Sequence, residues 1–426
     1  MKYNLSKLDN GIRVLTVPMP NLESATLAVW VKTGSRMEEA KINGLSHFLE
    51  HMVFKGSAKR PSAKEIAESI DSIGGEFNAG TSKDWTNFYI KARAGKLDRV
   101  FDVLSDVVLN PILAGAEIER EKGVIVEELR MYEDTPNIKI GDVFEELIFA
   151  GSPLGWDIGG SEKTVRSLKR DDFVRYREMH YYPENILITV AGGVKEKEVE
   201  KLAKKYFQKL QTSKTPNLQT FKVFKTWQKR PQVKLHPKKK EQAHFILGFL
   251  GNGRGYEGRY AEAVLSTILG GGMSSRLFTE VREKRGLSYA IKTSPERYSE
   301  TGYIGTYAGV DVKRVDEAIK VTLNEHYKLA DGSAPISKKE LDKAKEYIKG
   351  NIALALEDTK DVDGFFGEQE LFLGKILTPE EVFKKIDKVE IKDVLTEAKK
   401  LFRPEGLNLA IIGPYEGSSR FEKLLK

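Results

Sequence analysis

Short stretches in which apolar and polar residues alternate are the first regular feature of the chain, and this period of two predicts β-strands. In the first half of the sequence these stretches are 12–17, 25–33, 76–92 and 186–191. Between them, apolar residues recur every three to four positions, which predicts helices. The predicted helices follow Gly44, begin near Ser62, and cover 95–109, 114–133, 162–168, 171–180 and 195–208.

The order of predicted elements begins again after a polar stretch, 208–230, which we interpret as a linker. Strands are predicted at 233–235, 243–249, 288–294 and 302–310, and helices at 257–269, 312–330 and 337–356. This recurrence predicts two homologous domains, 1–210 and 230–426, related by an internal repeat of roughly 200 residues. Strands and helices are mixed and do not strictly alternate, so the pattern favours an α+β fold over a doubly wound parallel sheet.

Composition excludes several classes of protein. The chain has 426 residues and no cysteine, which rules out disulfides, thiolate metal sites and a cysteine nucleophile. Hydrophobic residues make up 40% and charged residues 31%, as in a soluble globular protein. The net charge of +7 is small beside 69 basic and 62 acidic residues, so we expect no nucleic-acid binding. No apolar run of membrane-spanning length and no signal-peptide pattern is visible, so we expect no membrane span and a cytoplasmic location.

The residues with the clearest chemical meaning are His47-Phe48-Leu49-Glu50-His51, an H-x-x-E-H motif. On a helix, the apolar residues in and around this motif fill one side, and His47, Glu50 and His51 fall together on the opposite side. Two histidines four positions apart can bind one zinc ion, and a glutamate one turn away can serve as general base. The alternative is a polar helix face that holds two histidines by chance.

A catalytic zinc site needs a third protein ligand, and the predicted helix 114–133 offers two carboxylates. Glu121 and Glu128 lie seven positions apart at the centre of its apolar face. The apolar residues that define this face are Ile118, Val124, Ile125, Leu129 and Tyr132. Buried carboxylates are costly unless they are paired or bind a metal, so we expect Glu128 to be a ligand and Glu121 to support the ligands through a hydrogen bond. The alternative is a structural ion pair with a lysine or arginine.

The sequence around the motif, from Gly44 to Gly56, closely resembles the active-site signature of the pitrilysin/insulinase family of zinc metallopeptidases, the inverzincins. Within that family it looks most similar to the bacterial relatives of the mitochondrial processing peptidase. The resemblance covers nearly the whole chain, and its further segments are 74–79 with Thr81 and Thr86, Glu121 with Glu128, 269–277, and 282–289.

This resemblance implies a fold of two tandem homologous domains, each a mainly antiparallel sheet with helices packed on it, which form half of a clamshell chamber. It implies that Glu128 joins His47 and His51 as the third zinc ligand, and that Glu121 is an acidic neighbour of the ligands. Glu50 is expected to be the catalytic base. The second half has no H-x-x-E-H motif, so we expect one zinc ion per chain.

The resemblance also assigns residues to the substrate. Arg282 and Tyr289 are implied to bind substrate and to help polarise the scissile carbonyl. Asn78 and Ala79 lie in an extended segment, and we expect this segment to be an edge strand that pairs with the substrate peptide.

We therefore expect a zinc endopeptidase that cleaves unfolded peptides or oligopeptides. One alternative is a non-catalytic structural or assembly subunit of the same fold. Another is a metal-storage or nucleic-acid-binding protein, which only the basic excess supports. Because the family's chamber contains four such domains, we expect a homodimer, or a heterodimer with a related chain. In this dimer Arg282 and Tyr289 of one subunit would reach the zinc of the other.

Overall fold

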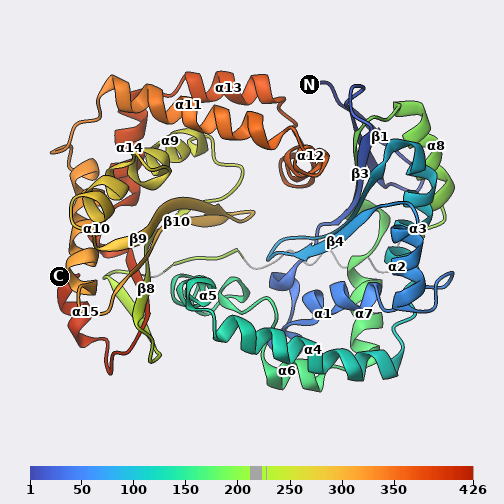
Figure 1. The fold of residues 1–426 in the computed structure, drawn as a ribbon, viewed down its shortest axis with the longest axis horizontal. Helices are drawn as coiled ribbons and strands as arrows, with labels where there is room; N and C mark the ends of the chain where they lie inside the picture. Colours follow the sequence, from blue (N-terminus) through green and yellow to red (C-terminus); the bar gives the residue numbers. More distant parts are fainter. Residues whose placement is uncertain (212–222, 227, 426) are drawn as a thin grey trace. The chain divides into compact units, whose positions relative to one another are not determined.

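The computed structural model describes residues 1–211, 223–226 and 228–425, and these form two compact units (Figure 1). The first unit contains Met1–Arg130, Trp156–Lys222 and Leu354–Thr378, and the second contains Met131–Gly155, Val223–Ala353 and Pro379–Lys426. Each unit is therefore built mainly from one half of the chain and receives one segment from the other half. The predicted linker lies largely outside the described residues, and the division into domains at 1–210 and 230–426 stays a prediction.

A six-stranded mixed sheet forms the centre of the first unit. In spatial order its strands are β1 (Asn4–Lys7), β2 (Arg13–Pro18), β6 (Ile186–Gly192), β3 (Ser24–Val31), β5 (Thr86–Arg93) and β4 (Glu76–Thr81). Strands β2 and β6 run parallel, and the other neighbouring pairs are antiparallel. The predicted strands of this half are confirmed, and the long extended stretch is a hairpin of two strands. The sequence pattern did not predict β1.

A five-stranded sheet forms the centre of the second unit. In spatial order its strands are β7 (Gln232–Pro237), β11 (Leu407–Gly413), β8 (Gln242–Asn252), β10 (Thr301–Asp311) and β9 (Ser288–Arg297). This order repeats β2-β6-β3-β5-β4, and the parallel pair, β7 with β11, stands in the same place. The shared topology confirms the internal repeat and the α+β class.

Helices surround both sheets. Those of the first unit are α1 (Leu45–Val53), α2 (Ala63–Asp71), α3 (Leu97–Leu109), α4 (Gly115–Glu133), α6 (Glu162–Ser167), α7 (Arg170–His180), α8 (Glu196–Phe207) and α12 (Thr359–Leu373). Those of the second unit are α5 (Pro136–Ile148), α9 (Arg259–Gly270), α10 (Val315–Ala330), α11 (Lys338–Ala355), α13 (Pro379–Asp387), α14 (Ile391–Leu401) and α15 (Ser419–Leu424). Among the described residues, no helix combines the length and the apolar character that crossing a membrane requires.

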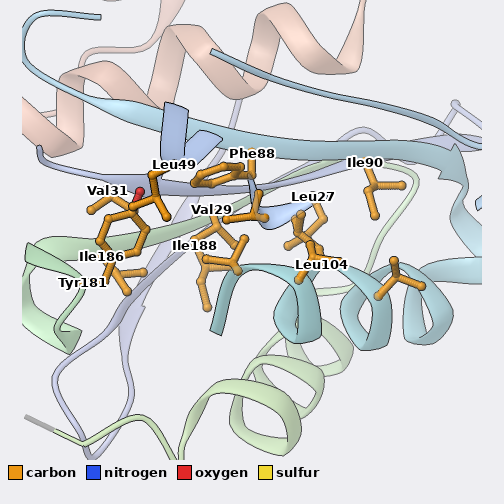
Figure 2. Close-up of a cluster of buried hydrophobic side chains, with 14 of the residues drawn as sticks. Leu27, Val29, Val31, Leu49, Phe88, Ile90, Leu104, Tyr181, Ile186 and Ile188 are labelled. Atoms are coloured by element: carbon orange, nitrogen blue, oxygen red, sulfur yellow. The ribbon is translucent and has the colours of Figure 1, made fainter. Parts of the chain in front are cut away.

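The core of the first unit lies between one face of its sheet and helices α1, α3 and α8. Alternate residues of β3, such as Leu27 and Val29, point into this core, as the period of two requires. Figure 2 shows them packed with side chains from neighbouring strands, from α3 and from α1, where Leu49 belongs to the motif helix. Each such buried side chain contributes about 1.5–3 kcal/mol, so the apolar side of α1 fixes the motif to the core.

The other face of each sheet is covered by a helix from the opposite half of the chain. Helix α12 packs on β6, β3 and β2, and α5 packs on β11, β8 and β7, which are the equivalent strands of the repeat. The α12 contact is partly polar. The hydroxyls of Thr26 and Thr359 lie 2.8 Å apart, and Nε1 of Trp30 donates to Asp363 over 3.2 Å. The two repeats have thus exchanged equivalent helices.

Asp363 gives the α12 contact a pH dependence. Its carboxyl group is 3% exposed, and burial raises its pKa from 3.8 to about 7 although Thr189 and Trp30 hydrogen-bond to it. Between about pH 4 and pH 7 the folded protein binds a proton at Asp363 that the unfolded chain has released. The stability that this proton gives to the folded state is lost progressively as the pH rises through this range to above 7.

We predict that Asp363→Asn, which cannot ionise, keeps stability that wild type loses as the pH rises. The free energy of unfolding of the variant, relative to that of wild type, should therefore increase from pH 5 to pH 8. The gain should be on the order of 2 kcal/mol, because one pKa unit corresponds to about 1.4 kcal/mol. Urea unfolding followed by tryptophan fluorescence at both pH values measures it, with Asp171→Asn on the exposed start of α7 as the control. A stability difference that is the same at pH 5 and pH 8 would contradict this assignment.

Candidate active site

Helix α1 divides the H-x-x-E-H motif into two sides. The apolar residues of the helix are at most 1% exposed and belong to the core of the first unit: Leu45, Phe48, Leu49, Met52 and Val53. His47, Glu50 and His51 lie on the other side and remain partly exposed. This confirms the two-sided helix, and it places three polar side chains in one shared space.

The two imidazoles converge with the carboxylate of Glu128 on α4. Nε2 of His51 lies 3.2 Å from Nε2 of His47, and Oε2 of Glu128 lies 3.6 Å from Nε2 of His47 and 3.5 Å from Nε2 of His51. Among the described residues, these three form a group whose ligand atoms all lie within 4.8 Å of one another. Their side chains are 15–22% exposed, so the point on which they converge is open to water and to a substrate.

Behind the imidazole of His51, a buried carboxylate and a lysine hold the ring in place. Oε1 of Glu121 lies 3.0 Å from Nδ1 of His51, and Nζ of Lys55 lies 2.6 Å from Oε2 of Glu121. A carboxylate can only accept, so Nδ1 of His51 donates and its Nε2 presents a lone pair toward His47 and Glu128. The arrangement fits the expected role of Glu121. Lys55 lies four positions after His51, just beyond the end of α1, and was not predicted as part of the site.

The protonation of the two histidines reflects the acidic surroundings. Burial and the nearby His51 lower the pKa of His47. Burial also disfavours the charged form of His51, but its hydrogen bond to Glu121 and the charge of Glu128 outweigh this and raise its pKa. Burial opposes ionisation of Glu121 as well, and its hydrogen bonds with His51 and Lys55 nevertheless lower its pKa. Positive charge is therefore favoured on His51 and disfavoured on His47.

The helical wheel of α4 was partly wrong. Glu121 is 3% exposed, as predicted, but Val124 is 49% exposed and does not belong to the buried face. Lys122 is buried instead, at 7% exposure, and its ammonium group reaches Glu119 over 2.7 Å. A lysine can cover apolar surface with its methylene stem and keep its charge near water. The buried face of α4 therefore includes Lys122 and leaves out Val124. A helical wheel drawn from apolar residues alone cannot predict this.

Glu50 is oriented by the edge of the sheet. Its Oε2 accepts a hydrogen bond from Oγ1 of Thr81, the last residue of β4, over 2.5 Å. Burial raises the pKa of Glu50, and the Thr81 hydrogen bond acts in the opposite direction. Strand β4 is the terminal strand of the sheet and pairs with β5. Asn78 and Ala79 lie on this strand, as expected, and Asn78 is exposed.

Arg282 and Tyr289 lie in the second unit, where they contact each other. Arg282 belongs to a short π-helical turn (Phe278–Glu283), and Tyr289 lies on β9, the terminal strand of the second sheet. The guanidinium carbon of Arg282 lies 4.9 Å from the centre of the Tyr289 ring and 4.6 Å from that of Phe278. Tyr289 is 80% exposed, so the pair presents an aromatic hydroxyl and a cation to the solvent.

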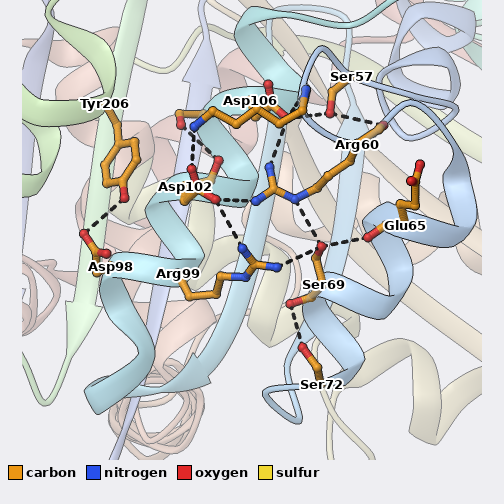
Figure 3. A network of polar contacts seen from close by, with 12 residues as sticks. Ser57, Arg60, Glu65, Ser69, Ser72, Asp98, Arg99, Asp102, Asp106 and Tyr206 are labelled. Carbon is orange, nitrogen blue, oxygen red and sulfur yellow. Dashed lines mark hydrogen bonds and ion pairs between the residues drawn. The ribbon is translucent and has the colours of Figure 1, made fainter.

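Polar contacts after the end of α1 fix the following loop to α2 and α3 (Figure 3). The hydroxyl of Ser57 donates to Asp106 over 2.6 Å, and Nη1 of Arg60 donates to the same carboxylate over 3.0 Å. Arg60 also donates to Asp102 of α3 and to Ser69 of α2. None of these residues was predicted from the sequence to support the site, because their partners lie more than 40 positions away or carry no catalytic signature.

Glycines allow a close backbone approach at the start of α1. Gly44 and Gly160 both have positive φ angles, +100° and +76°. A Cβ on Gly44 would lie 2.6 Å from the carbonyl oxygen of Gly159, and a Cβ on Gly160 would overlap the carbonyl oxygen of Asn43. Both values are closer than real Cβ contacts. The segment around Gly160 can therefore lie against the start of α1 only because neither glycine has a side chain.

Comparison with known proteins gives the family. Residues 13–158 match the family described as insulinase (peptidase family M16), and residues 167–348 match a family described as the peptidase M16 inactive domain. A relative from Bacillus subtilis, named as the uncharacterized zinc protease YmxG, is 37% identical over 95% of this chain and 97% of its own length. The chain belongs to the insulinase family, peptidase family M16. This confirms the resemblance read from the sequence.

A further relative and two solved structures are similar over nearly the whole length of the chain. A zinc protease named as uncharacterized from Streptomyces coelicolor is 35% identical over 96% of this chain and 88% of its own length. Among solved structures, a protease from Helicobacter pylori has a TM-score of 0.90 at 24% identity and covers 97% of this chain and 99% of its own. A peptidase M16 inactive domain from Pseudomonas fluorescens has a TM-score of 0.88 at 19% identity, over 98% and 99%. At these identities the two structures support the fold.

The converging group of this family member fits a zinc ion. Its donors are two imidazole nitrogens and one carboxylate oxygen, a set that zinc accepts in catalytic sites. The lone pair of His51 already points toward the other two donors because Glu121 holds its Nδ1 proton. The carboxylates of Glu121 and Glu128, which raise the pKa of His51 against the effect of its burial, would attract a cation to the same place.

We predict that Gly160→Ala destabilises the first unit far more than Gly74→Ala does. Both glycines have positive φ, +76° and +62°, but a Cβ on Gly74 would have no atom within 4 Å. The left-handed backbone alone costs about 1–2 kcal/mol, and Gly160→Ala adds a backbone overlap with Asn43 at the start of α1. Thermal unfolding of both variants measures the difference. Equal losses would show that the close approach at Gly160 carries no extra cost.

Proposed function

We propose that this chain is a zinc-dependent endopeptidase that cleaves unfolded peptides. The observation that carries this proposal is the convergence of His47, His51 and Glu128 beside Glu50 on one partly exposed surface. The zinc proteases among its relatives support peptidase activity in general. A complete set of ligands and a general base argue against a non-catalytic subunit.

We assign His47, His51 and Glu128 as the zinc ligands, with one ion per chain. Zinc in such a site supplies a Lewis acid that acidifies water and polarises a carbonyl. Glu50 takes a proton from the attacking water as the new carbon–oxygen bond forms. It then passes that proton to the amide nitrogen as the carbon–nitrogen bond breaks. The hydroxyl of Thr81 holds the Glu50 carboxylate in the orientation that this transfer needs.

The position of strand β4 at the edge of the sheet is evidence in favour of a peptide as the substrate. The strand ends the sheet, its last residue contacts Glu50, and Asn78 on it is exposed. An extended peptide can add to such an edge through backbone hydrogen bonds, which would place a peptide carbonyl near the ligands. A folded protein offers few extended segments of this kind, so the proposed substrate is an unfolded peptide.

We propose further that Arg282 and Tyr289 stabilise the negative charge that develops on the substrate carbonyl. The exposure of Tyr289 and the stacked guanidinium of Arg282 support this role. In the proposed assembly, two chains pair so that these residues of one chain complete the zinc site of the other.

We predict that Glu50→Gln retains zinc and loses nearly all peptidase activity. Glu50 is not a ligand in this proposal, and loss of a general base lowers rates by about a hundredfold to ten-thousandfold. Metal analysis and hydrolysis of a quenched fluorescent peptide library measure the two effects, with Glu128→Gln as the matched variant that should lose zinc. Loss of zinc in Glu50→Gln, together with zinc and activity retained in Glu128→Gln, would show that the roles are wrong.

We predict that two inactive variants restore activity when they are mixed. Arg282→Ala/Tyr289→Phe chains and Glu50→Gln chains should each be weak or inactive alone. A mixed dimer contains one site with every part intact. Peptide hydrolysis is measured after mixing, and exchange of subunits is checked with differently labelled chains. If the chains exchange and activity does not return, the site is not shared between chains.

A further inference from the structure

The start of α1 is held by a carboxylate that plays no part in the chemistry above. Glu38 follows the short 3-10 turn Ser35–Met37. Its Oε1 accepts a hydrogen bond from the backbone N–H of Ser46 over 2.6 Å, and its Oε2 accepts one from the N–H of Gly44 over 2.8 Å. Nδ2 of Asn43 donates to the same Oε2 over 3.0 Å. Glu38 is 4% exposed, so this is a buried, fully engaged side chain.

These contacts satisfy two of the four backbone donors that every helix leaves unpaired at its start, those of Gly44 and Ser46. A cap of this kind is normally provided by the residue next to the helix, but Gly44 has no side chain and makes no side-chain cap. Glu38, six positions earlier than Gly44, provides it from outside the helix. When ionised, its carboxylate also lies at the end of α1 where the helix dipole is positive.

The cap matters for the metal centre because of where His47 stands. Helix α1 has nine residues, and His47 is its third, within the turn that lacks intrahelical partners. A helix of this length is not stable by itself, so its first turn depends on outside contacts. His51 lies one turn further along and is already held by Glu121. A loosened first turn would therefore move the imidazole of His47 relative to that of His51.

Two residues that contact Glu38, Asn43 and Ser46, also join the start of α1 to other segments of the first unit. Nδ2 of Asn43 also donates to the carbonyl of Asp157 over 3.0 Å, and the hydroxyl of Ser46 lies 2.7 Å from that of Tyr176 on α7. Burial raises the pKa of Glu38 to about 7, against the hydrogen bonds that favour its charged form. Burial of the Glu38 carboxyl group costs free energy. In return, it supplies hydrogen-bond acceptors to the backbone N–H groups at the start of α1.

We propose that Glu38 is a positioning residue that sets the metal affinity of the site through the first turn of α1, an inference that rests on the proposed zinc site. A merely structural role would lower the stability of the first unit and leave the folded site unchanged. A positioning role lowers the zinc affinity of the folded protein. The two roles can be separated because zinc binding is measured on protein that remains folded.

The experiment compares Glu38→Ala, Glu38→Gln and Asp363→Asn in the full-length chain. Asp363 is the matched control: it is also a buried carboxyl group of the first unit, at 3% exposure, and it lies on α12. Metal-free protein is titrated with zinc against a chromophoric chelator, at a temperature where circular dichroism shows each variant to be folded. Cobalt(II) is then bound in place of zinc, and its visible absorption reports the geometry of the ligands.

We expect Glu38→Ala to bind zinc at least about tenfold more weakly than wild type, in the range found when residues that support metal ligands are removed. Its cobalt absorption should change in the same variant. Glu38→Gln should lose less, because its amide oxygen can still accept one of the two backbone N–H groups. Asp363→Asn should keep the wild-type affinity to within about twofold and the wild-type cobalt spectrum.

Wild-type affinity and an unchanged cobalt spectrum in folded Glu38→Ala would overturn the positioning role. If Glu38→Ala does not fold, the same two results in Glu38→Gln overturn it. Failure of the wild-type chain to bind zinc would overturn the zinc site itself and this inference with it. The proposal about Glu38 and the proposed function can therefore fail separately.

Discussion

The site depends on one constraint, which is that a nine-residue helix must hold two imidazoles in a fixed relation to a carboxylate on another helix. Helix α1 is too short to do this alone. Its apolar side is anchored in the core through residues such as Phe48 and Leu49. Its first turn is capped by Glu38, and its last turn is held by Glu121 and Lys55. The helix is thus fixed along its side and at both ends.

The sheet of the first unit is the surface on which α1 is held. In the first unit, α1 packs on the same face of the sheet as α3, and β4 brings Thr81 to Glu50 at the edge. The opposite face is closed by α12, which comes from the other half of the chain. Removing α12 would expose Trp30 and take away Asp363, the acceptor of its indole N–H. The exchange of equivalent helices therefore makes each sheet depend on both halves of the sequence.

Much of this could be predicted from the sequence, because the signals are periodic and local. Alternation predicted most strands of both repeats but missed β1 and β11, and the motif helix showed its two sides on a wheel. The proposed carboxylate ligand needed one further step, because Glu128 is 77 positions from His51 in sequence and was chosen for its place on a predicted apolar face. The resemblance to the insulinase family then supplied Arg282 and Tyr289, which carry no signal of their own.

The residues that escaped prediction share a different property. Glu38, Asp106 and the glycine pair at 44 and 160 act through backbone groups or through partners distant in sequence. A carboxylate that caps a helix from outside looks in the sequence like any solvated glutamate. The exposure of Val124 has a related cause. Hydrophobicity predicts that Val124 is buried and Lys122 exposed, but the methylene stem of Lys122 is buried and its ammonium group reaches Glu119. Periodicity reports which side of an element is buried, and it does not report which polar group meets which backbone.

The charges around the imidazoles favour a cation at this place. Four carboxylates act on the two rings: those of Glu50, Glu121, Glu128 and Asp157. Lys55 offsets part of this charge through its contact with Glu121. A carboxylate without a counter-charge is costly in a partly buried site. A cation held by the proposed ligands would offset this charge and would occupy both Nε2 lone pairs. Glu50 would then have no imidazolium beside it to compete for the proton of water.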